Sequence, residues 1–133
     1  MKLLLSGLFV LAAPMAFAGT EWEEDQLIIN RINATDFEVV ETQDMGPGAF
    51  WCGAASFHER RMGRSGRDML YVKQPRGPSV TRPGSKGVVF TTDAARVSAT
   101  GASGSVSVSR AGDGFRSSFA RSLCRDAFTR ATK

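Results

Sequence analysis

The sequence predicts an α+β domain in which an antiparallel or mixed sheet of about four to five strands carries two helices on one face. Short runs of β-branched and aromatic residues alternate with turn residues, which indicates strands. Two longer segments show helical apolar periodicity, and the order along the chain is β-β-α-β-β-β-α. Removal of the first 18 of the 133 residues leaves 115, the size of one domain, so residues 27–133 are expected to form a single domain.

The first 18 residues have the composition of a secretory signal peptide. Lys2 gives a positive start, an apolar stretch follows, and Ala16-Phe17-Ala18 forms a small-x-small cleavage box. The apolar stretch is shorter than the roughly 20 residues that span a bilayer, and no second stretch approaches that length. We expect cleavage after Ala18, a location in the periplasm or the extracellular medium, and an acidic, flexible leader at residues 19–26.

The first elements of the mature chain are expected to be a β-hairpin and a helix. The apolar run 27–32 and the alternating run 37–41 flank a turn signal at 33–36, which predicts two paired strands. The next segment begins with a proline, has apolar residues three and four positions apart, and is followed by a glycine. We therefore expect a helix over residues 47–62.

Three more strands are expected in the second half of the chain. Two of them, at 68–74 and 87–92, are separated by a proline-rich turn region at 75–86. The third is indicated at 105–109, where valines alternate with serines as on an edge strand, before a turn at 112–114.

The last helix is expected to begin near Ser117, a favourable N-cap residue. Its apolar residues recur at steps of four and five and predict one buried stripe. The stripe contains Phe119, Leu123, Cys124, Ala127, Phe128 and Ala131, and Arg121, Arg125 and Arg130 are expected on the other side.

Cys52 and Cys124 are the only cysteines, and an even pair in an exported chain predicts a disulfide. The bond would join the two helices and add about 4 kcal/mol to the stability by the chain-entropy relation. Cys52 also lies in the first helical turn, where a thiol is activated, so a small envelope enzyme using it as nucleophile is the alternative. The only histidine, His58, lies about 600° of helical rotation further on and points away from Cys52.

Metal and cofactor chemistry have little support in the sequence. His58 and Met62 lie four residues apart on one helix face, and both residue types bind copper in exported proteins. Two ligands do not complete a site, so we expect no metal. Neither GxGxxG nor GxxxxGK[ST] occurs, and the carboxylates form no evident acid/base pair, so no cofactor and no catalytic residue is predicted.

Charge is distributed unevenly along the chain, which has 17 basic and 13 acidic residues. Residues 19–44 contain eight acids and one arginine, a net charge of −7, whereas residues 45–133 contain fifteen bases and five acids, a net charge of +10. The basic residues gather at the end of the first helix and in two loops. They are Arg60, Arg61, Arg64, Arg67, Arg76, Arg82 and Lys86.

If the two loops meet at one end of the sheet, these residues form a surface for an anionic envelope component or an acidic protein. The simpler interpretation is a solvated face that the acidic segment partly neutralises. Nucleic acid is a poorer fit, because Tyr71 is the only aromatic residue close to the arginines in sequence.

Three short segments within residues 46–128 resemble small exported proteins of uncharacterised function in proteobacteria. They are Phe50-Trp51-Cys52-Gly53-Ala54-Ala55, Arg76-Gly77-Pro78-Ser79-Val80-Thr81 and Leu123-Cys124. The resemblance implies bacterial export and pairing of the cysteines, and it implies no activity. The sequence as a whole favours a non-enzymatic exported accessory or binding protein, with the Cys52 enzyme or an inhibitor of a secreted hydrolase as alternatives.

Overall fold

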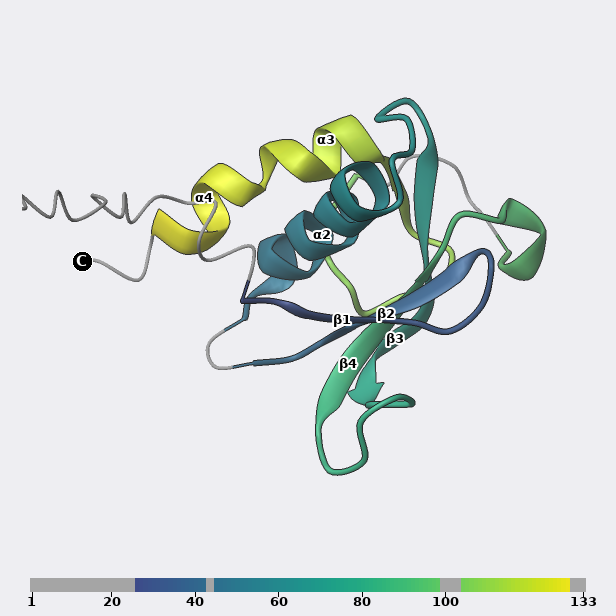
Figure 1. The fold of residues 1–133 in the computed structure, drawn as a ribbon, viewed down its shortest axis with the longest axis vertical. Helices are drawn as coiled ribbons and strands as arrows, with labels where there is room; N and C mark the ends of the chain where they lie inside the picture. The colour runs from purple at the N-terminus through teal and green to yellow at the C-terminus, as the bar shows by residue number, and fades with distance from the viewer. Residues whose placement is uncertain (1–25, 43–44, 99–103, 130–133) are drawn as a thin grey trace, which may run out of the picture.

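The computed structural model describes residues 26–42, 45–98 and 104–129, and these form an α+β fold (Figure 1). Five antiparallel strands make one sheet in the order β1-β2-β4-β3-β5, with the helices on one face, as the sequence predicts. The strands are β1 (Ile28–Arg31), β2 (Asp36–Val40), β3 (Met69–Pro78), β4 (Lys86–Thr91) and β5 (Gly114–Arg116). The predicted signal peptide and nearly all of the predicted leader lie outside the described residues.

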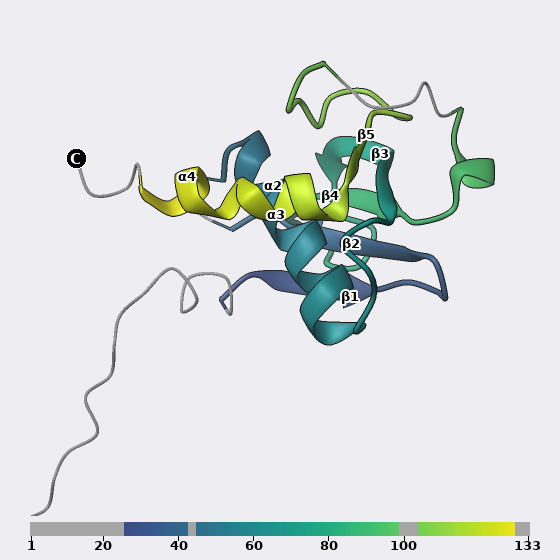
Figure 2. The same ribbon diagram turned by 90° about the horizontal axis from the view of Figure 1, so that it is seen from above.

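The helical layer consists of one long helix and a second helix in two parts. Helix α2 (Pro47–Ser56) continues into a π-helical turn, η1 (Phe57–Arg61), so the predicted helix over 47–62 is confirmed with a widened last turn. The second helix is divided at Leu123 into α3 (Ser117–Ser122) and α4 (Cys124–Thr129), which lie along α2 (Figure 2). A short 3-10 turn, η2 (Ala94–Arg96), follows β4. Among these helices, none has the length and apolar character needed to cross a membrane.

The hydrophobic core lies between α2 and the sheet. Trp51 is fully buried, and its ring meets Phe90 and Phe115 edge to face, with centroids 5.0 and 4.9 Å apart. Its indole N–H donates a hydrogen bond of 3.1 Å to the carbonyl of Val106. Alternation along the strands directs one set of apolar side chains toward this helix. That set includes Phe37, Val39, Leu70, Val72, Val88 and Phe90.

The opposite face of β2 is also buried, because the β3–β4 hairpin loop folds over it. Glu38 is 1% exposed, and its carboxylate accepts hydrogen bonds from the Ser79 hydroxyl (2.6 Å) and the Val80 amide (2.9 Å). The amide and hydroxyl of Thr81 also donate to it. Gly87 lies against this side chain, since a Cβ there would stand 2.8 Å from a Glu38 oxygen. Any larger residue at position 87 would therefore displace the carboxylate.

Two strand predictions are wrong in their limits. The predicted strand at 105–109 is irregular, because the Ser107 hydroxyl accepts a hydrogen bond from the Ser109 amide and bends the chain locally. The fifth strand lies instead at Gly114–Arg116, directly after a turn at 111–112 that overlaps the predicted one. Residues 75–78, predicted as loop, continue β3, whose two register shifts against β4 accommodate its prolines.

The second helix also differs from its prediction in which residues it buries. Ser117 is the first helical residue rather than the N-cap, and its hydroxyl donates to Glu59 at 2.7 Å. Phe119 is 45% exposed, whereas Ala120 is fully buried against α2. Arg121 was expected on the outer side but donates to the Ser56 hydroxyl on α2 at 2.6 Å. The contact between the second helix and the end of α2 therefore includes polar side chains as well as apolar ones.

Gly63 ends the π-helical turn in a left-handed conformation, with φ of 63°. We expect Gly63→Ala to lower the free energy of unfolding by about 1–2 kcal/mol, because an L side chain disfavours this conformation. The new Cβ would meet no atom within 4 Å, so the cost is conformational. Gly48→Ala, in helix α2 with equal space around it, is the control and should be neutral or stabilising. Urea unfolding of both variants measures the difference.

Candidate functional site

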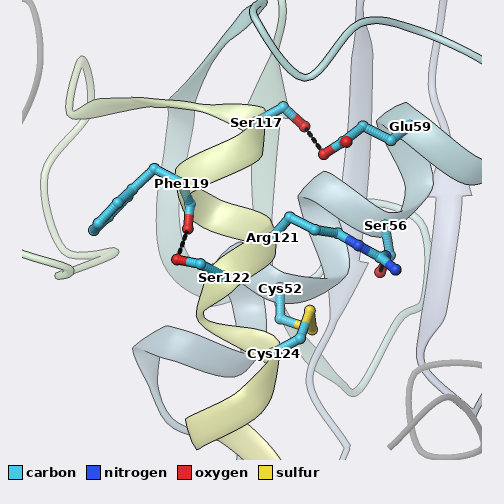
Figure 3. The surroundings of a disulfide bond; sticks show 8 residues. All are labelled: Cys52, Ser56, Glu59, Ser117, Phe119, Arg121, Ser122 and Cys124. Carbon is cyan, nitrogen blue, oxygen red and sulfur yellow. Dashed lines mark hydrogen bonds between the residues drawn. A yellow bond between two sulfur atoms is a disulfide. The ribbon is translucent and has the colours of Figure 1, made fainter.

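The predicted disulfide between Cys52 and Cys124 is present and joins α2 to the start of α4 (Figure 3). The two Cα atoms are 4.8 Å apart, and both residues are buried at the interface of the helices. A sulfur held in this bond provides no thiolate, so Cys52 has no nucleophilic form in this structure. A free-thiol count on the folded protein distinguishes this state from the Cys52 enzyme.

His58 is buried and faces Asp68, not Cys52. Its Nε2 atom lies 2.9 Å from the Asp68 carboxylate, and the histidine is 2% exposed. His58 and Met62 line the same small crevice, as their spacing suggests, but the described residues contain no group of three His, Cys, Asp or Glu side chains that could hold a metal ion. The hydrogen bond to Asp68 instead fixes the loop that leads from η1 into β3.

The seven predicted anion-binding residues fall into two groups, so the two loops that carry them do not meet at one end of the sheet. Four of them lie at the end of η1 and in the loop before β3, and they define what we call the arginine end: Arg60, Arg61, Arg64 and Arg67. The other three lie toward the β3–β4 hairpin, at the far end of the molecule (Figure 1). Arg76 lies near the far end of β3 (Met69–Pro78), and Arg82 and Lys86 lie beyond it, so most of the length of this strand separates the two groups.

The hairpin group is the weaker candidate. The Arg76 guanidinium forms an ion pair with Glu41 and lies over the Phe50 ring, 5.8 Å from its centroid. An acid of the N-terminal segment thus neutralises it, as the simpler interpretation of the charges expects. Arg82 and Lys86 are exposed at the hairpin, without a third basic residue of the predicted set beside them.

The loop of the arginine end is held in one conformation by backbone bonds. The Ser117 amide donates to the Asp68 carbonyl and the Ser118 amide to the Gly66 carbonyl, both at 2.8 Å. The Ser65 hydroxyl accepts from the Arg67 amide at 3.1 Å. A loop whose backbone is fixed in this way loses little backbone freedom on binding.

The acids nearest to the arginine end are occupied by other partners. Glu59 accepts from Ser117, and Asp68 lies against His58. Within the described residues, Arg61, Arg64 and Arg67 are exposed and form no ion pair. Their positive charge therefore faces solvent.

Sequence reasoning missed Arg31, which belongs to the same end of the molecule. Arg31 ends β1 and, together with Arg64, lines a small crevice between the β1–β2 turn and η1. Arg31 is the only base in the acidic segment 19–44, so sequence reasoning assigns it to that segment and not to the basic residues. The sequence predicted the hairpin but held no signal for how it is placed against α2.

Asp36 and Glu38 are a buried carboxylate pair on one face of β2, which sequence reasoning did not place. Burial alone would raise the pKa of Asp36, yet hydrogen bonds from Lys73, Thr91, Asn33 and Thr35 outweigh it and hold that pKa well below its usual range. Burial would also raise the pKa of Glu38, but hydrogen bonds from the hairpin loop outweigh it. The pKa of Glu38 is therefore lowered as well. Both groups stay ionised at neutral pH, and neither supplies the proton that general acid catalysis needs.

A larger hollow of about 630 Å³ lies at the start of α2. Residues 46–49 and 105–107 line it together with Leu123, Asp126 and Ala127. Its lining is mainly apolar. Two of the lining segments, 46–49 and 105–107, lie close in sequence to residues 43–44 and 99–103, which are outside the described residues. The hollow contains none of the predicted site residues.

Comparison with known proteins found no family model, curated protein or solved structure that matches this chain. The interpretation of the arginine end therefore rests on the geometry of its own residues.

Proposed function

We propose that this chain is an exported, non-enzymatic accessory protein that binds an anionic component of the cell envelope through the arginine end. The observation that carries the proposal is that the end of η1 and the fixed loop after it expose Arg61, Arg64 and Arg67, while the acids Glu59 and Asp68 are bound to other groups. Guanidinium groups suit this role, because they are always charged and pair with phosphate or carboxylate in a bidentate geometry. The disulfide supports export, since such bonds persist in oxidising compartments.

The test compares two double variants that each remove two positive charges. We expect Arg64→Ala with Arg67→Ala to weaken binding to anionic vesicles or to polygalacturonate about thirtyfold, since each basic residue near an anionic surface contributes about 1 kcal/mol. Arg82→Ala with Lys86→Ala, at the hairpin, should change binding far less. Raising the salt to about 0.5 M should abolish the binding of the unchanged protein, because exposed charges are then screened.

Two results would contradict the proposal. The first is that the unchanged protein binds neither anionic probe at low salt, and the second is that the two double variants lose binding equally. Equal losses would show that only net charge matters and that the arginine end has no special role.

The inhibitor alternative calls for a separate measurement. A basic surface attracts an acidic target, so an inhibited hydrolase would carry the opposite charge. The same Arg64 and Arg67 variants would then lose the inhibition of an acidic secreted hydrolase.

A further inference from the structure

The crevice at the arginine end is small and is bounded by two separate segments. Arg31, Asn33 and Thr35 line it from the β1–β2 turn, and His58 and Arg64 line it from η1 and the following loop. Its volume of about 20 Å³ gives room for one or two oxygen-sized atoms. That space admits oxygens of a phosphate group and excludes a sugar ring or a peptide side chain.

The charge of the crevice suits such an anion. Arg31 and Arg64 flank it, and within the described residues neither forms an ion pair. Asp36 also lines the crevice, but Lys73 contacts this carboxylate and Arg96 lies 3.6 Å from it. The two cations offset the Asp36 charge, so the two flanking arginines leave the crevice positive.

The residue that follows Arg31 is an exposed apolar one, Ile32. Ile32 lies between Arg31 and Asn33 in sequence, is 42% exposed, and does not line the crevice. The turn that carries it is fixed, because the Ile32 amide donates to the Asp36 carbonyl at 2.9 Å. The Asn33 side chain also accepts from the Thr35 and Asp36 amides. Ile32 is therefore an exposed residue of a fixed turn, next in sequence to Arg31.

The other exposed large apolar residues in the described ranges lack this setting. Val80 lies on the β3–β4 hairpin loop that covers Glu38. The Phe119 ring packs on Phe115 with centroids 4.8 Å apart. Of these three residues, only Ile32 is next in sequence to an arginine that lines the crevice.

We infer that the anionic partner is a phospholipid surface, whose phosphate oxygens enter the crevice between Arg31 and Arg64 while Ile32 inserts among the headgroups. This inference rests on the proposed function and names the partner of the same site. Peripheral attachment to anionic membranes combines such charge attraction with burial of apolar side chains at the headgroup level. An acidic polysaccharide would engage the arginines but leave Ile32 in water.

The test uses the purified protein, vesicles containing phosphatidylglycerol, and polygalacturonate as a second anion. Ile32→Ser should weaken vesicle binding about fivefold, because the apolar area it buries is lost. Val80→Ser, the matched control on the hairpin, should have little effect. Arg31→Ala should weaken vesicle binding about fivefold and Arg82→Ala much less. Ile32→Trp should strengthen vesicle binding, since tryptophan favours the membrane interface.

The outcomes separate this inference from the proposed function. If Ile32→Ser and Val80→Ser bind vesicles equally while the Arg64 and Arg67 variant loses binding, the phospholipid inference is overturned and anion binding stands. Binding to polygalacturonate alone would also overturn it. If the unchanged protein binds neither probe at low salt, the proposed function fails as well.

Discussion

Replacing both cysteines, Cys52→Ala with Cys124→Ala, is expected to lower the free energy of unfolding by about 4 kcal/mol. The disulfide closes a loop of 72 residues that contains β3, β4, β5 and α3. Without it the unfolded chain gains the entropy of that loop, whereas the folded chain loses only a buried sulfur contact. Because small domains have about 5–15 kcal/mol of net stability, much of the protein's margin would disappear.

Urea unfolding at equilibrium measures this effect. The unchanged protein in excess reductant should approach the double variant, since both lack the cross-link. Ser122→Ala, an exposed change near the disulfide that removes one hydrogen bond to the Phe119 carbonyl, is the control and should cost well under 1 kcal/mol. An unchanged urea midpoint for the double variant would mean that the two helices hold together without the bond.

Glu38→Gln is expected to destabilise the fold by about 2–4 kcal/mol, although it conserves the shape of the side chain. The amide keeps one acceptor oxygen but turns a donor toward groups that themselves donate, including the Val80 and Thr81 amides. Hydrogen bonds to a charged group contribute about 1.5–3 kcal/mol, and a buried donor left unpaired adds a desolvation cost. Glu41→Gln is the control, because its partner Arg76 is partly exposed, and it should cost at most about 1 kcal/mol.

The same carboxylates make stability depend on pH in one direction. The pKa values of Asp36 and Glu38 are lowered in the folded state, so the unfolded chain binds more protons in acid. Their contribution is complete above the unfolded pKa values of about 4 and is lost as the pH falls through the folded ones. The temperature of half-unfolding should therefore decrease as the pH is lowered below about 4, and it should decrease less steeply in Glu38→Gln. A midpoint independent of pH in that range would contradict the ionised, buried state of both groups.

The elements that the sequence predicts correctly are those with a strong local pattern. Helix 47–62 has a proline start, apolar spacing and a glycine end, and the 27–41 hairpin has two runs around a clear turn. The three-residue strand β5 has no such pattern. It exists because Leu70 and its neighbours in β3 offer it a pairing edge, which only the folded sheet supplies.

The site was predictable in composition but not in placement. The arginines at 60–67 are close in sequence and remain together, whereas most of the length of β3 separates them from the bases at 76–86. Glu38 alternates with Phe37 and Val39 and so reads as a solvent-facing residue. Its burial comes from a loop 41 residues or more away, which no local pattern reports.

The position of the cross-link also decides what a protease leaves behind. A single cut anywhere between Cys52 and Cys124 yields two fragments that the disulfide keeps covalently attached, so a nicked molecule keeps its helices and all five strands in one piece. A cut in the connection between β2 and α2 is different, because β1 and β2 are then retained only by sheet pairing and core contacts. Resistance to proteolysis should therefore depend most on that connection.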